Sequence, residues 1–461
     1  MSNKKGLFAL SPLLVFLAIY LGSAILASDF YKVPISVAFM LASIYAVATL
    51  RGYSMQQRIA VFSQGAGTPN IMLMLWVFIL AGAFAASARH IGCIDATVNV
   101  MLTIMPHSLV LPGLFLATCL ISMAIGTSVG CIVALVPIAA GMAASMHGNT
   151  AFYTAIVVSG AFFGDNLSFI SDTTIAATTT QRCNMADKFK ANAYIALPAA
   201  IIVFIIYAVL GAQSPLLPPI GQVQYIKLLP YAVVLVAAIM GLNVLVVLAL
   251  GIALTGLIGV STDSTTIYGW FTSMGSGIMG MGELIIITML AGGMFEIVKE
   301  NRGIEYVIQK TTHCIQGKRG GQLVIGALVS VVDVCTANNT VAIITVGGIA
   351  RRLGQRYGIA PRRVASLLDT FACFMQGLLP YGAQMLMAAG LAHITPVDIM
   401  PHLYYTYVLG AMALLSIVFS FPNPHTANPY LNNTRHAYTR YCNTQFFRPH
   451  ALRCTTPSTA T

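Results

Sequence analysis

The sequence predicts an all-α polytopic membrane protein with about ten transmembrane helices, two re-entrant hairpins and two inverted-topology repeats that contain broken helices. Three observations support this prediction. Of the 461 residues, 57% are hydrophobic and only 8% are charged, whereas a soluble domain carries about 25% charged residues. Apolar stretches of about 20 residues recur along the chain. An offset of 211 residues, which places Asp165 on Gln376, aligns the two halves of the chain without a gap.

Ten apolar stretches are predicted to cross the membrane as helices, because a backbone in lipid must satisfy its own hydrogen bonds. In chain order they are residues 7–28, 33–50, 70–88, 152–180, 191–212, 229–240, 243–260, 282–298, 361–389 and 403–421. The first is too long for the apolar core of a signal peptide and is followed at once by a second, so we expect it to be retained. Polar residues or Gly and Pro interrupt the stretches 152–180 and 361–389, which predicts two broken helices.

Two further apolar segments, residues 109–146 and 322–350, are longer than one crossing and have a polar centre. Thr127 and Ser128 lie at the centre of the first, and Asn338, Asn339 and Thr340 at the centre of the second. Such polar tips are tolerated in a membrane where they are buried in protein or line a cavity, which favours re-entrant hairpins. A single kinked helix is the alternative for each segment.

The basic residues predict the orientation of the chain. With the amino terminus in the cytoplasm, all 24 Lys and Arg residues except Lys32, Arg89 and Lys227 fall on the cytoplasmic side, and Lys188 and Arg363 are among them. This follows the positive-inside rule and predicts an inner-membrane protein with both termini in the cytoplasm. Residues 1–212 would form the first repeat and residues 213–422 the second. Residues 423–461 are polar and have no apolar period, so we expect a disordered cytoplasmic tail.

The offset of 211 residues places one hairpin tip on the other and one broken helix on the other. Thr127 falls on Asn338, and Asp165 falls on Gln376. Each half contains five crossings and one hairpin, and because five is odd, the second half must be inverted relative to the first. Inverted repeats with broken helices are typical of secondary transporters, and the breaks mark the binding site.

The first broken helix contains the residues best suited to ion chemistry. Asp165 and Asp172 lie there with Ser168, Ser171 and Thr173. A buried carboxylate is costly unless it binds a cation, accepts hydrogen bonds or holds a proton. Carboxylate, hydroxyl and freed carbonyl oxygens would together form a shell suited to Na⁺, with Asp165 as its charged ligand. One carboxylate that binds either Na⁺ or a proton would exchange the two ions. For Asp172, capping of the second half-helix is an equal alternative.

The run Gly-Asp-Asn-Leu-Ser-Phe-Ile-Ser-Asp-Thr-Thr at residues 164–174 resembles the signature of the NhaC family of sodium/proton antiporters. The likeness covers residues 7–421, with Phe169 where the family usually has Pro. The resemblance implies two inverted repeats, re-entrant hairpins and cation exchange driven by the opposing ion gradient. It also implies that Asp165, Ser168, Ser171, Asp172 and Thr173 belong to the cation and proton site. Relatives in this family also exchange organic acids or amino acids.

The second half carries a neutral counterpart of this site. Asn338, Asn339 and Thr340 would face Gln376, where their amides could bind a cation or a solute. Hydrogen bonds that join the hairpin to the helix are the structural alternative. Asp333 lies before the second tip and Asp369 before the second break, and ionisable residues inside spans are candidates for relaying protons.

These features predict a secondary transporter that moves Na⁺ out and H⁺ in by alternating access. The alternative is a sodium- or proton-coupled carrier or exchanger of a small organic acid or amino acid. We expect no enzymatic activity, no cofactor beyond the transported Na⁺ and H⁺, and no nucleic-acid partner. The lipid bilayer would surround the protein, and the sequence allows a homodimer. No nucleotide-binding Gly-Lys motif is present in the sequence, so ATP-driven pumping is not expected.

Overall fold

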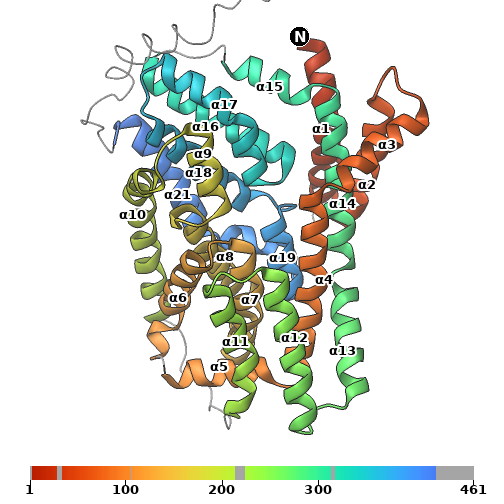
Figure 1. Ribbon diagram of the computed structural model, residues 1–461, viewed down its shortest axis with the longest axis vertical. Coiled ribbons are helices and arrows are strands. Elements are labelled where there is room, and N and C mark those ends of the chain that lie inside the picture. The colour runs from red at the N-terminus through yellow and green to blue at the C-terminus, as the bar shows by residue number, and fades with distance from the viewer. Residues whose placement is uncertain (1–2, 28–33, 105, 213–223, 313–316, 422–461) are drawn as a thin grey trace, which may run out of the picture. The chain divides into compact units, whose positions relative to one another are not determined.

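The computed structural model describes residues 3–27, 34–104, 106–212, 224–312 and 317–421. Every regular element in these ranges is a helix, which confirms the predicted fold class (Figure 1). Lys32 and the predicted tail, residues 423–461, lie outside the described residues.

The helices of the N-terminal half follow the predicted apolar stretches closely. They are α1 (Asn3–Ala27), α2 (Ile35–Thr49), α3 (Met55–Ala66), α4 (Pro69–His90), α5 (Cys93–Ile104), η1 (His107–Leu109), α6 (Val110–Ile125), α7 (Ser128–Ser145), α8 (Thr150–Leu167), α9 (Asp172–Gln181) and α10 (Met185–Ala212). The helices of the C-terminal half are η2 (Tyr225–Leu228), α11 (Leu229–Ile239), α12 (Val244–Ser261), α13 (Ile267–Gly280), α14 (Gly282–Glu300), α15 (Gly303–Thr312), α16 (Gly317–Thr336), α17 (Asn339–Arg356), α18 (Pro361–Leu378), α19 (Ala383–Ala392), α20 (Pro396–Ile399), η3 (Met400–His402) and α21 (Tyr404–Val418).

Seven helical stretches in the described residues are long and apolar enough to cross a membrane, and the bent pair Pro396–His402 and Tyr404–Val418 makes an eighth. The predicted crossings 33–50 and 229–240 form helices of only 15 and 11 residues, so the count of about ten stays a prediction. α10 exposes Ile201, Ile205 and Val209 at a spacing of four residues. Such an apolar stripe on the outside of a helix is suited to contact with lipid.

Three pairs of helices related by 211 residues have the same boundaries. Ser128–Ser145 corresponds to Asn339–Arg356, and the pairs α8 with α18 and α9 with α19 agree equally well. Each hairpin turns through one left-handed residue, Gly126 (φ 75°) in the first and Ala337 (φ 50°) in the second. In Figure 1, α5, α6 and α7 occupy the lower half, whereas their counterparts α15, α16 and α17 occupy the upper half. This arrangement agrees with an inversion between the halves, which itself stays a prediction.

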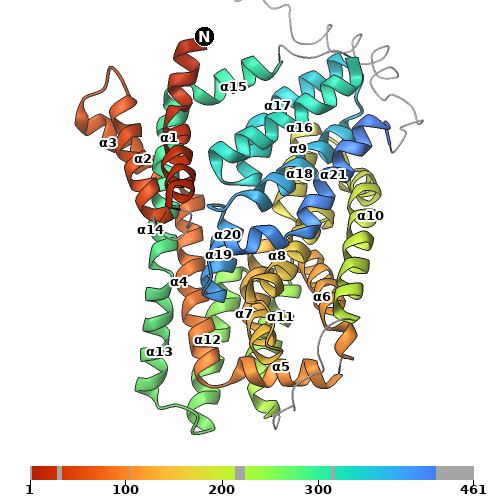
Figure 2. The ribbon, with the colours of Figure 1, turned by 180° about the vertical axis from the view of Figure 1, so that it is seen from behind.

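The helices pack into two groups that both draw on the two halves of the chain (Figures 1 and 2). The first helix group comprises α1–α4 and α11–α14, and the second helix group comprises α6–α10 and α16–α21. α5 and α15 contact both groups and lie across opposite edges of the structure. Within the first group, α4 and α13 cross at Gly82 and Gly277, where an added Cβ would lie 2.4 and 2.1 Å from the facing carbonyl oxygen. Small residues allow such close contact between membrane helices.

Two cavities lie between the two helix groups. The α13 cavity, of 720 Å³, is lined by the C-terminal part of α4, by α13 and by the end of α19 at Leu391 and His393. The α15 cavity, of 450 Å³, is lined by the start of α4 at Asn70, by α14 and α15, and by the second hairpin tip at Asn338. Ala383, the first residue of α19, lines the α15 cavity. The two cavities therefore approach α19 from opposite ends.

Candidate cation-binding site

Hydroxyl groups hold the break between α8 and α9. The carbonyl oxygen of Asp165 accepts hydrogen bonds from Ser171 Oγ at 2.7 Å and from Thr173 Oγ1 at 3.2 Å. The carbonyl oxygen of Ser168 accepts one from Thr174 Oγ1 at 2.8 Å. The last carbonyls of a helix need donors when water is excluded, which explains why hydroxyl residues follow the break so densely.

The carboxylate of Asp165 faces the N-terminus of α7 at the first hairpin tip. Its Oδ1 accepts a hydrogen bond from the Ser128 backbone N–H at 2.9 Å, and its Oδ2 accepts one from Ser128 Oγ at 2.5 Å. Asp165 is only 5% exposed. The preceding residue is glycine because an added Cβ at Gly164 would lie 2.1 Å from Ser122 Oγ. The two donors and the positive end of the α7 dipole stabilise the carboxylate and leave it lone pairs for a cation.

The structure brings together only some of the predicted first-site residues. Ser128, Ser171 and Thr173 contact Asp165. Ser168 donates instead to the carbonyl oxygen of Met123 at 2.9 Å. Thr127 precedes α7 without capping it, and Asp172 is exposed on the first turn of α9, which Ser171 caps through the Thr174 N–H.

A chain of side-chain hydrogen bonds joins the two breaks. Gln384, near the start of α19, donates from Nε2 to Ser128 Oγ at 3.2 Å. Its Oε1 accepts from Gln376 Nε2 at 2.8 Å, and the same nitrogen of Gln376 donates to the carbonyl oxygen of Ala337 at 3.2 Å. Asp165 is thereby connected through Ser128 and Gln384 to the second hairpin tip. Gln376 is among the residues predicted from the sequence, whereas Gln384 is not.

Some buried polar atoms at the second hairpin tip and the second break have no hydrogen-bond partner among the described residues. Asn338 caps α17 by accepting from the Val341 N–H at 3.0 Å. Asn339 Nδ2 and Gln376 Oε1 are buried and have no hydrogen-bond partner among the described residues. Thr340, the residue after Asn339, is half-buried. A donor and an acceptor left unpaired near one break are groups that a polar ligand could satisfy.

A buried ion pair joins α10 to α18. Lys188 Nζ lies 2.5 Å from Asp369 Oδ2, with both side chains almost completely buried. Asn192 donates to the same carboxylate oxygen at 2.8 Å. Lys188 also donates to the carbonyl oxygen of Asn166 at 2.8 Å and to Thr174 Oγ1 at 2.5 Å. The pair therefore links α18 to both sides of the first break, at Asn166 and at Thr174.

Lys188 and Arg363 are predicted only as cytoplasmic charges, but the structure buries both side chains and so gives them a second role. Arg363 donates to Gln322 at 2.9 Å and to Ser416 at 2.8 Å. The signal for Lys188 is present in the sequence, because it falls on the same helical face as Asn192 and the other buried residues of α10.

Asp333 is fully buried on α16, and neither of its carboxylate oxygens has a hydrogen-bond partner among the described residues. An ionised carboxylate in that setting is costly, so the neutral acid is the favoured form. Asp333 thus differs from Asp369, which has a cation beside it. Of the two predicted relay residues, Asp333 is the one free to gain and lose a proton without breaking an ion pair.

Replacing Gln384 by Leu is expected to weaken sodium use without unfolding the protein. The change removes two hydrogen bonds of about 1 kcal/mol each between the breaks, so the Na⁺ concentration for half-maximal exchange should rise about tenfold. Initial rates in proteoliposomes over a series of Na⁺ concentrations measure this effect. Met385→Leu, a volume-conserving change at the next residue, should leave the value unchanged. Wild-type sodium dependence in Gln384→Leu would show that the hydrogen-bond chain plays no part in the site.

Comparisons with known proteins identify the family of this chain. The model of the Na⁺/H⁺ antiporter family matches residues 6–212 and 217–421. The chain is 23% identical to the Na⁺/H⁺ antiporter NhaC of Bacillus subtilis over 76% of this chain and 83% of that protein. It is 23% identical to an uncharacterized Na⁺/H⁺ antiporter of Haemophilus influenzae, over 72% and 78% of the two chains.

A third relative is named for the transport of organic acids as well as of ions. The malate-2H⁺/Na⁺-lactate antiporter of Bacillus subtilis is 24% identical over 43% of this chain, and the match spans 41% of that antiporter's own length. The family match, in contrast, extends over nearly all of the described residues. The chain therefore belongs to the Na⁺/H⁺ antiporter family.

Proposed function

We propose that this protein exchanges cytoplasmic Na⁺ for external H⁺ by alternating access, with Asp165 holding either ion. The observation that carries the proposal is the buried Asp165 carboxylate, which faces a helix N-terminus and is bonded to Ser128 where two broken helices meet. When ionised it can bind Na⁺, and when protonated it cannot. Competition for one carboxylate then couples the two ion movements, because neither ion can occupy the site while the other is bound.

The oxygens nearest to Asp165 would complete the sodium shell. Ser128 Oγ contacts the carboxylate, and Ser171 and Thr173 place their hydroxyl oxygens at the Asp165 carbonyl. Hydroxyl, carbonyl and carboxylate oxygens are hard ligands, which small hard cations prefer. Asp333 would carry a second proton, since its buried oxygens have no donor among the described residues.

The arrangement of the two helix groups supports alternating access. The α13 and α15 cavities reach opposite ends of α19, and the α15 cavity does so at Tyr381 and Ala383, beside Gln384 and the second break. A small movement of the second helix group against the first would widen one cavity and narrow the other. Movement of one bundle against another around a central site is the usual behaviour of transporters with inverted repeats. In the orientation that the basic residues predict, both termini are cytoplasmic in the inner membrane, and the α13 cavity faces outward.

Exchange can be measured with the purified full chain in proteoliposomes. The vesicles hold an acidic interior and a pH-sensitive dye, and valinomycin with equal K⁺ on both sides removes any membrane potential. External NaCl should raise the internal pH, whereas choline chloride should not. A response to Na⁺ no larger than the response to choline would refute the proposal.

A second candidate function is exchange or cotransport of a small organic acid or amino acid. Two observations favour it: the unpaired Asn339 Nδ2 and Gln376 Oε1 at the second break, and the 450 Å³ cavity beside Asn338. A cavity of that volume is larger than a sodium ion needs and falls in the range of small-molecule sites. If this function is correct, NaCl alone will leave the internal pH unchanged in the same vesicles. One member of a panel of carboxylates and amino acids would then be required for the change.

A further inference from the structure

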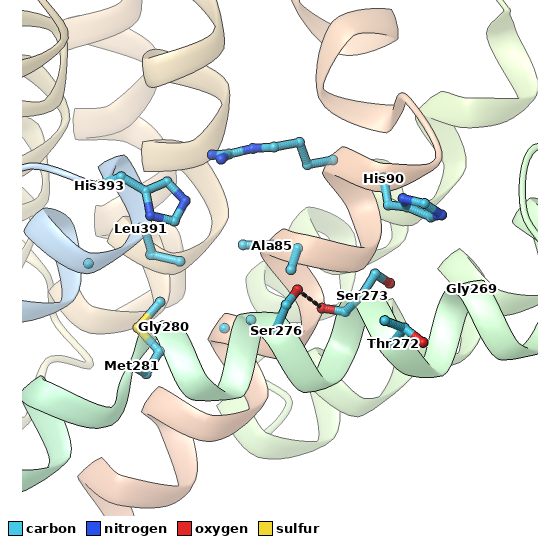
Figure 3. A pocket seen from close by; sticks show the side chains of 15 residues that line it. Ala85, His90, Gly269, Thr272, Ser273, Ser276, Gly280, Met281, Leu391 and His393 are labelled. Atoms are coloured by element: carbon cyan, nitrogen blue, oxygen red, sulfur yellow. Dashed lines mark hydrogen bonds between the residues drawn. The ribbon is translucent and has the colours of Figure 1, made fainter.

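The α13 cavity is lined by three basic side chains. It has a volume of 720 Å³, within the range of about 300–1,000 Å³ that small-molecule sites occupy. Arg89, His90 and His393 line it, and no Asp or Glu is found among the described residues of its wall. Figure 3 shows His393 and His90 on opposite sides of the cavity, with Ser273 and Ser276 of α13 between them. The cavity is therefore positively charged without an acidic partner.

Of these three side chains, Arg89 carries the permanent positive charge. The ion pairs within the described ranges join Lys188 to Asp369 and Lys299 to Glu296, and no hydrogen bond or ion pair of the Arg89 guanidinium occurs there. Arg89 is also one of only three basic residues predicted on the outer side, where the positive-inside rule disfavours it. An unpaired guanidinium presents a planar fork of donors that matches a carboxylate.

The remaining polar groups of the wall are suited to a ligand that also carries a donor. Thr272, Ser273 and Ser276 donate their own protons to carbonyl oxygens of α13, at 2.9, 2.8 and 2.8 Å. Their hydroxyl oxygens can therefore accept a hydrogen bond from a hydroxyl or ammonium group of a ligand. His90 is already bonded to Thr265 at 3.0 Å, which leaves His393 as the second group free for the anion.

We infer that the α13 cavity binds a small organic carboxylate, held by the Arg89 guanidinium on α4 and by His393 at the end of α19. The ligand would bridge the two helix groups, because α4 belongs to the first and α19 to the second. It would also neutralise Arg89 on the outward path from Asp165, where an unpaired positive charge repels Na⁺. The site is separate from the Asp165 carboxylate and from the cavity beside Asn338.

Binding can be measured directly by isothermal titration calorimetry on the full chain in lipid nanodiscs. The probes are acetate, lactate, succinate, malate and glutamate, each titrated as its choline salt. At least one should bind to the wild type. Arg89→Gln should raise its Kd about tenfold or more, since a charge-assisted bidentate contact is lost. Arg89→Lys keeps the charge without the fork and should give an intermediate Kd.

Two matched variants locate the site. Lys227→Gln removes another basic residue of the same predicted side that does not line the cavity, and its Kd should equal that of the wild type. Asn338→Ala alters the α15 cavity and should also leave the Kd unchanged. If no probe binds, or if Arg89→Gln binds as the wild type does, the inference is wrong. If Asn338→Ala alone abolishes binding, the carboxylate binds at the second break and the inference is likewise overturned. Because calorimetry needs no transport, these results are independent of the sodium/proton exchange assay.

Discussion

Replacing Asp165 by Asn is expected to abolish sodium-dependent proton exchange while the protein still inserts and folds. The amide has nearly the same shape as the carboxyl group and can keep a hydrogen bond to Ser128. It has no charge for Na⁺, however, and cannot take up the exchanged proton. We expect the initial rate of sodium-driven internal alkalinisation in proteoliposomes to fall by about 100-fold or more, which corresponds to a loss of about 2.8 kcal/mol of binding free energy.

The matched control for this variant is Asp187→Asn. Asp187 lies on the first turn of α10, is half-exposed, and is not among the hydrogen-bond partners of the Asp165 carboxylate in the described residues. Its amide variant should exchange at the wild-type rate. Monodisperse size-exclusion profiles and equal reconstitution of both variants show that a loss of rate is not a loss of protein. Exchange at the full rate in Asp165→Asn would remove this carboxylate from the mechanism.

Replacing Lys188 by Met is expected to have the largest effect on stability. Removal of one partner leaves the Asp369 carboxylate buried without its cation, which costs about 3–5 kcal/mol of folding free energy. It also takes away the donor that Lys188 provides to the Asn166 carbonyl. We expect the apparent Tm in detergent to drop sharply, and Asp369→Leu to act in the same way, because a buried lysine is then unpaired.

The double variant Lys188→Met with Asp369→Leu separates the charge effect from a packing effect. Replacement of a whole buried ion pair by apolar residues of similar volume is often neutral or stabilising. Most of the lost Tm should therefore return in the double variant. Lys190→Met, two residues along on the exposed side of α10, should melt like the wild type. Single variants as stable as the wild type, or a double variant as unstable as its parents, would show that the pair contributes no net stability.

The local features of the site could be predicted from the sequence. The hairpin tips lie at Thr127 and Asn338 and the breaks follow Leu167 and Leu378, as the polar interruptions and the offset of 211 residues indicate. These features depend on residues that are close together in the sequence. Examples are the left-handed Gly126, the cap at Ser171 and the apolar stretches that flank each polar tip. The positions of the tips and breaks can therefore be predicted from a short stretch of sequence.

The contacts between distant segments could not be predicted in the same way. Gln384 bonds to Ser128, which is 256 residues away in the sequence. Lys188 contacts Asp369 only because α10 packs on α18. Such pairings depend on the rotation and depth of one helix against another, which apolar composition leaves undetermined. Asp172 shows the opposite case, since it stands within the most informative motif but its side chain is exposed. Sequence alone therefore located the two helix breaks but did not determine which side chains meet there.

The short length of α19 has an electrical consequence. Its 10 residues span about 15 Å, half the thickness of a hydrocarbon core of about 30 Å, and they separate the α13 cavity from the α15 cavity. Cavities of this size admit water beside polar wall residues such as Ser273 and Asn338, and water conducts and holds little voltage. The membrane potential then falls mainly across α19 and the neighbouring breaks, so the field there is about twice that of an unperturbed bilayer. A potential of 100 mV, worth about 2.3 kcal/mol per elementary charge, would act on a cation over the distance of about 15 Å between the two cavities.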